Sequence, residues 1–168
     1  MAGVVAIVGG CAANAAQGAS TATTVVPAGH VALRTVTIAR FHTRALADGA
    51  GYALYIFAPD HRRAVTCFGT CALTWPPVTV AAGRRPRLGA GVEAGLVGVM
   101  KDMGHYVVTY NGWPLYSYVA DVHPRTASGE GIDLNGGAWY LMRPDGQALV
   151  PKGQPPLEVP LAPRPGAR

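Results

Sequence analysis

Two cysteines that lie close together are the residues of this sequence with the clearest chemical potential. Cys67 and Cys71 are four positions apart. In an exported protein such a pair is usually a structural disulfide, and a loop this small should contribute about 2 kcal/mol to stability. The alternative is a copper or thiol-redox site, because soft thiolates together with an imidazole suit Cu(I). The candidate third ligands are His61, His105 and His123.

Two aspartates that each have a nearby histidine form a second candidate. They are Asp60 with His61 and Asp121 with His123. A carboxylate beside an imidazole suits metal binding or acid–base chemistry. The alternative is that each aspartate caps a turn and each histidine is exposed, which is the interpretation we favour. We therefore expect neither a metal nor another cofactor, with copper at Cys67 and Cys71 as the alternative.

Aromatic residues form a third group, and most of them are expected to pack in a core. The set is Tyr52, Tyr55, Phe57, Trp75, Tyr110, Trp113, Tyr116, Tyr118, Trp139 and Tyr140. Trp113 follows Asn111-Gly112 at a predicted hairpin tip, so it is the best candidate for an exposed ligand or interface residue. His61 and His123 are further candidates of this kind.

Other enzyme and nucleic-acid signatures are absent from the sequence. None of the three serines stands in a Gly-x-Ser-x-Gly motif, and there is no P-loop, Gly-x-Gly-x-x-Gly or His-Glu-x-x-His motif. The net charge is +5, but the arginines come in small groups without a basic block. The sequence therefore predicts a protein that is not an enzyme and binds no nucleic acid.

The composition predicts many short strands as the elements that must position these residues. The chain has 168 residues, with 22 Gly and 14 Pro, and 49 % of it is hydrophobic. That is room for one domain, or two very small ones. The five stretches that read as strands are 31–38, 52–58, 105–110, 113–119 and 138–142. Asn111-Gly112 is a strong hairpin signal, and a short helix is expected near Cys71–Trp75.

A sequence motif occurs twice. Residues 54–60 and 115–121 both read Leu-Tyr-x-aromatic-x-x-Asp, and a tryptophan follows each copy. The motif residues are Tyr55, Phe57, Asp60, Tyr116, Tyr118 and Asp121. Two such units must pack together to bury their faces. We expect an all-β fold, a small antiparallel barrel or sandwich made of two repeats at about 45–80 and 105–142.

On these motifs the chain resembles the predicted bacterial lipoproteins with a Tyr-x-aromatic-x-x-Asp motif, also called the secreted repeat of unknown function. The segments that carry the resemblance are 54–60, 67–77, 109–121 and 129–140, and together they cover roughly residues 45–145. The resemblance implies a small secreted or lipid-anchored domain. It implies no reaction.

The first residues resemble an export signal. Residues 2–10 are apolar or small, and Val8-Gly9-Gly10-Cys11 resembles the bacterial lipobox, in which the cysteine is lipid-modified. We therefore expect a signal segment at 1–10, lipidation at Cys11 and a flexible tether at 11–29. A buried N-terminal strand with an ordinary cysteine is the alternative. The β domain would span 30–150, followed by a proline-rich tail at 151–168.

The sequence thus predicts a lipoprotein of the bacterial cell envelope, anchored to a membrane and facing the periplasm or the exterior. The first hypothesis for its function is a non-catalytic binding or scaffolding module for an envelope protein. The alternative is a copper-binding or thiol-redox accessory protein that uses Cys67 and Cys71.

Overall fold

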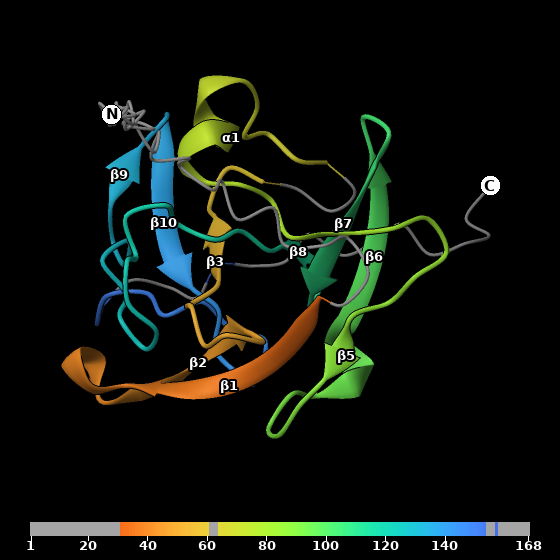
Figure 1. Cartoon of the computed structure of the whole chain (residues 1–168). Helices are drawn as coiled ribbons and strands as arrows, with labels where there is room; N and C mark the ends of the chain where they lie inside the picture. Colours follow the sequence, from red (N-terminus) through yellow and green to blue (C-terminus); the bar gives the residue numbers. More distant parts are fainter. Residues whose placement is uncertain (1–30, 61–63, 154–156, 158–168) are drawn as a thin grey trace, which may run out of the picture.

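A computed structural model describes residues 31–60, 64–153 and 157 of the chain. Within these residues it consists of short strands and a single short α-helix (Figure 1). The expected all-β fold is confirmed: the strands form several small sheets in a sandwich-like arrangement, and they do not close into a barrel. Cys11 and His61 lie outside the described residues, as do the predicted signal segment and the tether.

The strands form three sheets. The first has the order β2-β1-β5, with β1 at Ala32–Ile38, β2 at Thr43–Asp48 and β5 at Arg87–Leu88. The second has the order β3-β10-β9, with β3 at Tyr55–Phe57, β10 at Gly137–Leu141 and β9 at Asp133–Leu134. The third has the order β4-β7-β6, with β4 at Thr79–Val80, β7 at His105–Tyr110, β6 at Val97–Asp102, and β8 at Trp113–Pro114 paired with β7.

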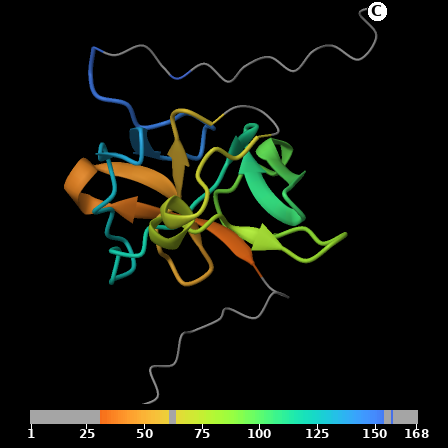
Figure 2. The ribbon, with the colours of Figure 1, turned by 90° about the horizontal axis from the view of Figure 1, so that it is seen from above.

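Three helical segments complete the described elements. Helix α1 spans Thr70–Thr74, where the sequence predicts a short helix, and 3-10 turns span Ala39–Phe41 and Ala94–Leu96. The β1–β2 hairpin (orange) and the β6–β7 hairpin (green) lie on different sides of the domain (Figures 1 and 2).

Tight turns of one kind connect three strand pairs. The predicted hairpin at Asn111-Gly112 is confirmed, with φ of 47° and 82°. Met103-Gly104 connects β6 to β7 with φ of 43° and 85°, and Asn135-Gly136 connects β9 to β10 with φ of 61° and 90°. Two positive φ angles match the twist of the flanking strands. The last two turns were not expected from the sequence, because strands β6 and β9 were not predicted.

The two predicted motif strands are shorter than expected. Only Tyr55–Phe57 of residues 52–58 and Trp113–Pro114 of residues 113–119 are strands. The remaining residues pass between sheets and make isolated bridges, such as Ala53 with Ala47. The prediction that residues 52–58 are buried on both faces is confirmed for β3, whose three residues are all buried.

Backbone hydrogen bonds around the two motifs occur in matching sets. In each set, three residues form a closed triangle in which the N–H of one donates to the carbonyl of the next. In the first triangle, Leu46 donates to Met142, Met142 to Leu54 and Leu54 to Leu46. In the second, Val108 donates to Val78, Val78 to Leu115 and Leu115 to Val108. All six N···O distances lie between 2.8 and 3.1 Å. We call residues 31–92 the first half of the domain and residues 97–153 the second half. Each triangle therefore joins the hairpin and motif of one half to the residues that follow the tryptophan of the other half.

Tyr55 and Tyr116 lie at the centre of this arrangement. Each donates its N–H to the carbonyl of the other, and both N···O distances are 2.9 Å. The two halves of the domain are thus related by an approximate two-fold axis that passes between these residues. The equivalent hairpins are β1–β2 and β6–β7, because Leu46 lies in β2 and Val108 in β7.

Candidate functional site

The two copies of the motif exchange their side-chain hydrogen bonds across the approximate two-fold axis. The Tyr55 hydroxyl donates to Oδ2 of Asp121 at 2.6 Å, and the Tyr116 hydroxyl donates to Oδ2 of Asp60 at 2.5 Å. All four side chains are buried. A hydrogen bond to a carboxylate is strong in such surroundings. The tyrosine of each motif therefore stabilises the buried aspartate of the other.

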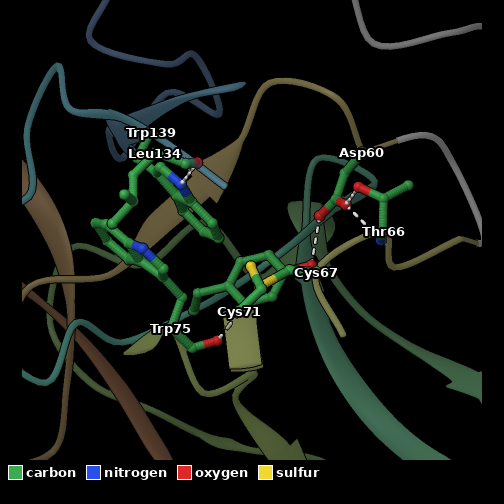
Figure 3. The surroundings of a disulfide bond; sticks show 8 residues. Asp60, Thr66, Cys67, Cys71, Trp75, Leu134 and Trp139 are labelled. Carbon is green, nitrogen blue, oxygen red and sulfur yellow. Dashed lines mark hydrogen bonds between the residues drawn. A yellow bond between two sulfur atoms is a disulfide. The ribbon is translucent and has the colours of Figure 1, made fainter. Parts of the chain in front are cut away.

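The second oxygen of each aspartate holds the loop that follows it. Oδ1 of Asp60 accepts the Thr66 N–H at 2.8 Å and the Thr66 hydroxyl at 2.7 Å (Figure 3). Oδ1 of Asp121 accepts the Ser128 N–H at 2.7 Å. The structure therefore places the motif aspartates in loop-holding roles, as expected from the sequence, with partners six and seven residues further along.

Both motif tyrosines keep their protons at neutral pH. Burial, reinforced by the hydrogen bond and charge of Asp121, raises the pKa of Tyr55 far above its ordinary value. Burial and the charge of Asp60 do the same for the pKa of Tyr116. The hydroxyls therefore act as permanent hydrogen-bond donors.

Four aromatic rings form a column between the two halves. The stacked pairs are Phe57 with Trp139 at 4.3 Å, Trp139 with Trp75 at 4.0 Å, and Trp75 with Tyr118 at 4.0 Å between ring centroids. The edges of Tyr55 and Tyr116 meet Trp75 and Trp139. The order of the column follows the two-fold axis, because each tryptophan stacks on an aromatic residue of the opposite half.

The two tryptophans differ in their hydrogen bonding. Nε1 of Trp139 donates to the Leu134 carbonyl at 3.0 Å (Figure 3). Nε1 of Trp75 is buried and has no hydrogen-bond partner among the described residues. A buried donor without a partner destabilises a protein by about 1–3 kcal/mol, so Trp75 lowers the stability of the fold in a way that Trp139 does not.

The predicted disulfide is present. Cys67 and Cys71 are bonded, with Cα atoms 5.2 Å apart. The bond joins the loop before α1 to the second residue of the helix, next to Trp75 (Figure 3). The Trp75 N–H caps the helix at the Cys71 carbonyl at 2.8 Å. Cys67 and Cys71 are only 2 % and 7 % exposed. Because thiol–disulfide exchange requires access to a sulfur, this burial favours the structural interpretation of the pair.

A cleft of about 480 Å³ lies beside the disulfide, between the loop that contains Cys67 and the tip of the β6–β7 hairpin. Its walls are mostly apolar and include Val65, Cys67, Pro77 and Val107. The polar groups in its lining are Thr79, Asp102 and His105. We call this the disulfide cleft. Its size falls in the range typical of ligand sites.

Two exposed apolar side chains flank the disulfide cleft. Phe68, between the two cysteines, is 47 % exposed, and Met103, at the hairpin tip, is 74 % exposed. Met103 has a φ of 43°, a conformation in which asparagine and glycine are far commoner than methionine. A side chain of this size, exposed in an unfavourable backbone conformation, is a candidate contact residue.

The structure separates the remaining candidates that the sequence suggested. Trp113 was expected to be exposed and is 4 % exposed, because the tight turn before it directs its ring into the core. His123 is exposed, and it does not line the disulfide cleft. His105 does line the cleft, together with Cys67. Both aspartates of the two Asp–His pairs are buried, and His61 lies outside the described residues.

Glu130 is a residue that the sequence analysis missed. Its Oε2 accepts the Leu141 N–H at 2.6 Å, and it lines a second cleft, of about 340 Å³, with Phe41 and Leu149. Burial raises the pKa of Glu130 to about 7. Its sequence context gave little indication of this role, because Glu130 stands in an Ala-Ser-Gly-Glu-Gly segment whose composition predicts a flexible loop. In the structure this loop is held against β10 by the hydrogen bond to Leu141.

Residues 98–143 match the model of a protein family described as a secreted repeat of unknown function. The resemblance noted in the sequence is confirmed over this segment. It extends from β6 to just beyond β10 and so covers most of the second half of the domain. No curated protein and no solved structure matches the chain. In the described part of the chain, no helix is long and apolar enough to cross a membrane.

Proposed function

We propose that the protein is a non-catalytic binding module of the bacterial cell envelope, built from two copies of one structural unit and anchored through a lipid on Cys11. The family description as a secreted repeat supports an extracytoplasmic location. The exchanged hydrogen bonds of the two motifs support the two-unit architecture. The observation that carries the binding role is the disulfide cleft with its two exposed apolar side chains.

The disulfide cleft suits an apolar side chain of a protein partner. Exposed Phe68 and Met103 would be covered by such a partner, and their burial would favour association. The side chains of Thr79, Asp102 and His105 have no hydrogen-bond or ion-pair partner among the described residues, so they are available to orient the bound group. The disulfide beneath Phe68 holds this wall of the cleft in place.

The tyrosines and aspartates of the two motifs support a catalytic role less than they support a structural one. The motif tyrosines are protonated donors, and the motif aspartates are buried acceptors that hold loops. This arrangement stabilises the fold and leaves binding to the surface.

The binding role can be tested by affinity purification of the lipidated protein from cross-linked native membranes. We expect Phe68→Ala and Met103→Asn to reduce recovery of the main partner at least tenfold. Leu134→Ala, at an exposed leucine remote in sequence from the cleft, serves as the matched control and should leave recovery unchanged. Equal recovery with all three variants would contradict a partner at this cleft. Cys11→Ala should move the protein from the membrane to the soluble fraction.

Copper binding is the second candidate, and the shared cleft is the observation that favours it. Cys67, His105 and the thioether residue Met103 line the same cavity. Reduction of the disulfide would add two thiolates to an imidazole and a thioether, a donor set that Cu(I) prefers. Titration of the reduced protein with Cu(I) should then show one equivalent bound, and His105→Ala should weaken it. Absence of stoichiometric binding would reject this candidate.

A further inference from the structure

The approximate two-fold axis identifies an open strand edge in the second half of the domain. Leu46 pairs with Thr35 in the first hairpin, and Val108 pairs with Val99 in the second. Because Leu46 and Val108 are equivalent, Thr35 is equivalent to Val99, and Leu33 to Val97. Strand β1 of the first half therefore corresponds to β6 of the second.

The outer edge of β1 is covered by an extended segment of the chain. The carbonyls of Val31 and Leu33 accept the N–H groups of Arg87 and Gly89, at 2.8 and 2.7 Å. The Thr35 N–H donates to the Ala90 carbonyl at 3.3 Å. Part of this segment is strand β5, which runs parallel to β1.

The outer edge of β6 has no such cover among the described residues. The tight turn pairs Asp102 with His105, so in the alternating pattern of an antiparallel pair Gly98, Met100 and Asp102 bond to β7. The Val97 carbonyl, both backbone groups of Val99 and the Lys101 N–H therefore point outward. No described residue outside β7 pairs with β6. Figure 1 shows β6 at the outside of its sheet.

We propose that β6 binds an extended peptide segment of a partner protein by strand addition. The inference rests on the binding role proposed above and adds a second surface for it, distinct from the disulfide cleft. Exposed strand edges are templates for added strands, and main-chain hydrogen bonds then supply much of the affinity. Residues 87–90 already bind the equivalent edge of β1, so an edge with this geometry can accept an extended chain.

The surroundings of β6 define the chemistry of the segment. Val97 and Val99 are half-buried and pack against the core, so the added strand covers them best with aliphatic side chains. Lys101 is exposed at the far end of the strand, and an acidic residue opposite it would form a favourable cross-strand pair. The occupant is therefore an extended aliphatic segment with an acidic residue near the end that meets Lys101.

Val99→Pro tests this surface with little effect on the fold. The Val99 N–H points away from β7, so proline at this position removes a donor from the open edge and leaves the β6–β7 ladder intact. Val99→Thr retains the N–H and the branched shape and is the matched control. Lys101→Pro, which also removes an outward N–H, is the second blocking variant in case Val99→Pro does not fold.

The probe is a phage-displayed library of random 12-residue peptides, selected on the full chain. We expect enriched peptides with alternating aliphatic residues that bind Val99→Pro at least tenfold more weakly and Val99→Thr within twofold of the natural chain. Amide resonances of Val97, Val99 and Lys101 should shift on binding. Failure to enrich any peptide, or enriched peptides that bind Val99→Pro normally, would overturn the proposal.

Additional measurements separate this inference from the binding role at the disulfide cleft. Peptides that are lost with Phe68→Ala but retained by Val99→Pro would refute the open edge and leave the cleft proposal standing. A dimer in sedimentation that Val99→Pro dissociates would make a second copy the occupant. Peptide binding to a chain that ends at Gly153, but not to the full chain, would make the C-terminal tail the occupant. Either result overturns the partner segment.

Discussion

Each motif aspartate is buried, and hydrogen-bond donors satisfy both of its oxygens. A tyrosine hydroxyl from the other half reaches one oxygen, and an N–H of the following loop reaches the other. Burial of a carboxylate is costly unless its oxygens are satisfied. Tyrosine and aspartate therefore depend on one another, although they belong to different copies of the motif.

Tyr55→Phe should destabilise the protein by about 2–3 kcal/mol, because it leaves the buried Asp121 carboxylate without its hydroxyl donor. Urea denaturation measures the loss. Tyr52→Phe is the matched control, since Tyr52 is only half-buried and no hydrogen bond to its hydroxyl occurs among the described residues. A loss for Tyr55→Phe no larger than that of the control would contradict the role of the pair.

Glu130 should make stability depend on pH in the neutral range. Its pKa is about 7 in the folded protein and near 4.5 when exposed, so the folded state binds the proton more tightly. The stabilisation that the folded protein gains from this proton is complete below about pH 4.5 and is lost as the pH rises through 7. With allowance for partial exposure it amounts to about 1–2 kcal/mol.

Glu130→Gln should remove that dependence while it retains an oxygen for the Leu141 N–H. Free energies of unfolding at pH 5 and pH 8 should converge for this variant relative to the natural chain. Asp133→Asn, an exposed substitution nearby in sequence, should leave the difference in place. An unchanged pH difference in Glu130→Gln would show that other groups produce it.

At the scale of elements, helix α1 is too short to be stable alone. It has five residues and no side-chain cap at its N-terminus. Its order comes from the disulfide, from the packing of Trp75 and from the Val119 N–H, which donates to the Thr74 carbonyl at 3.1 Å. The helix in turn positions Phe68 at the disulfide cleft.

Replacing both cysteines by alanine should therefore lower stability by about 2 kcal/mol and disorder the wall of the cleft. Urea denaturation and amide hydrogen exchange of residues 66–75 would measure these effects. Reduced natural protein is the control and should show the same loss. Unchanged exchange in this segment would mean that packing alone holds the helix.

The turn at Met103 should carry a conformational cost. Met103→Asn places a residue suited to positive φ at the first position of the turn, and should stabilise the β6–β7 hairpin by about 0.5–1 kcal/mol. Thermal denaturation measures the gain. Met103→Ala, which lacks this preference, should not stabilise the protein. A stabilised variant that has lost its partner would identify Met103 as a residue retained for binding.

At the scale of the whole molecule, neither half contains a complete core. The hydrogen-bonded triangles, the Tyr–Asp pairs and the aromatic column each require residues from both halves. The family model matches most of one half, so the matched unit is complete here only when its counterpart is present.

Residues 97–153 expressed alone should therefore lack a cooperative unfolding transition, or fold only as a dimer of that half. Mixing them with residues 31–92 should restore a folded complex, visible as dispersed amide resonances. Matched mixing with a first half that carries Asp60→Ala should fail. An independently folded monomeric second half would contradict the exchange of contacts.

Local patterns were sufficient to predict some of these features. Asn111-Gly112 favours positive φ wherever it occurs, and the β-branched and aromatic residues of 105–110 indicate a strand without reference to its partner. The close cysteines, the short helix near Cys71–Trp75 and the repeated motif could also be recognised in the sequence. Strands β6 and β9 were missed because Met103 is an unusual turn residue and β9 has only two residues.

The sequence by itself determined that this is an all-β chain with two copies of a Leu-Tyr-x-aromatic-x-x-Asp motif and a close pair of cysteines, because each feature depends on residues close together along the chain. The structure then showed that this pair is a disulfide. The tertiary structure decided which tyrosine bonds which aspartate, that Trp113 is buried, and that His105 and Cys67 share a cleft. These relations join residues up to 66 positions apart. They depend on how the two halves pack, and packing is set by the complementarity of whole surfaces that no single segment encodes.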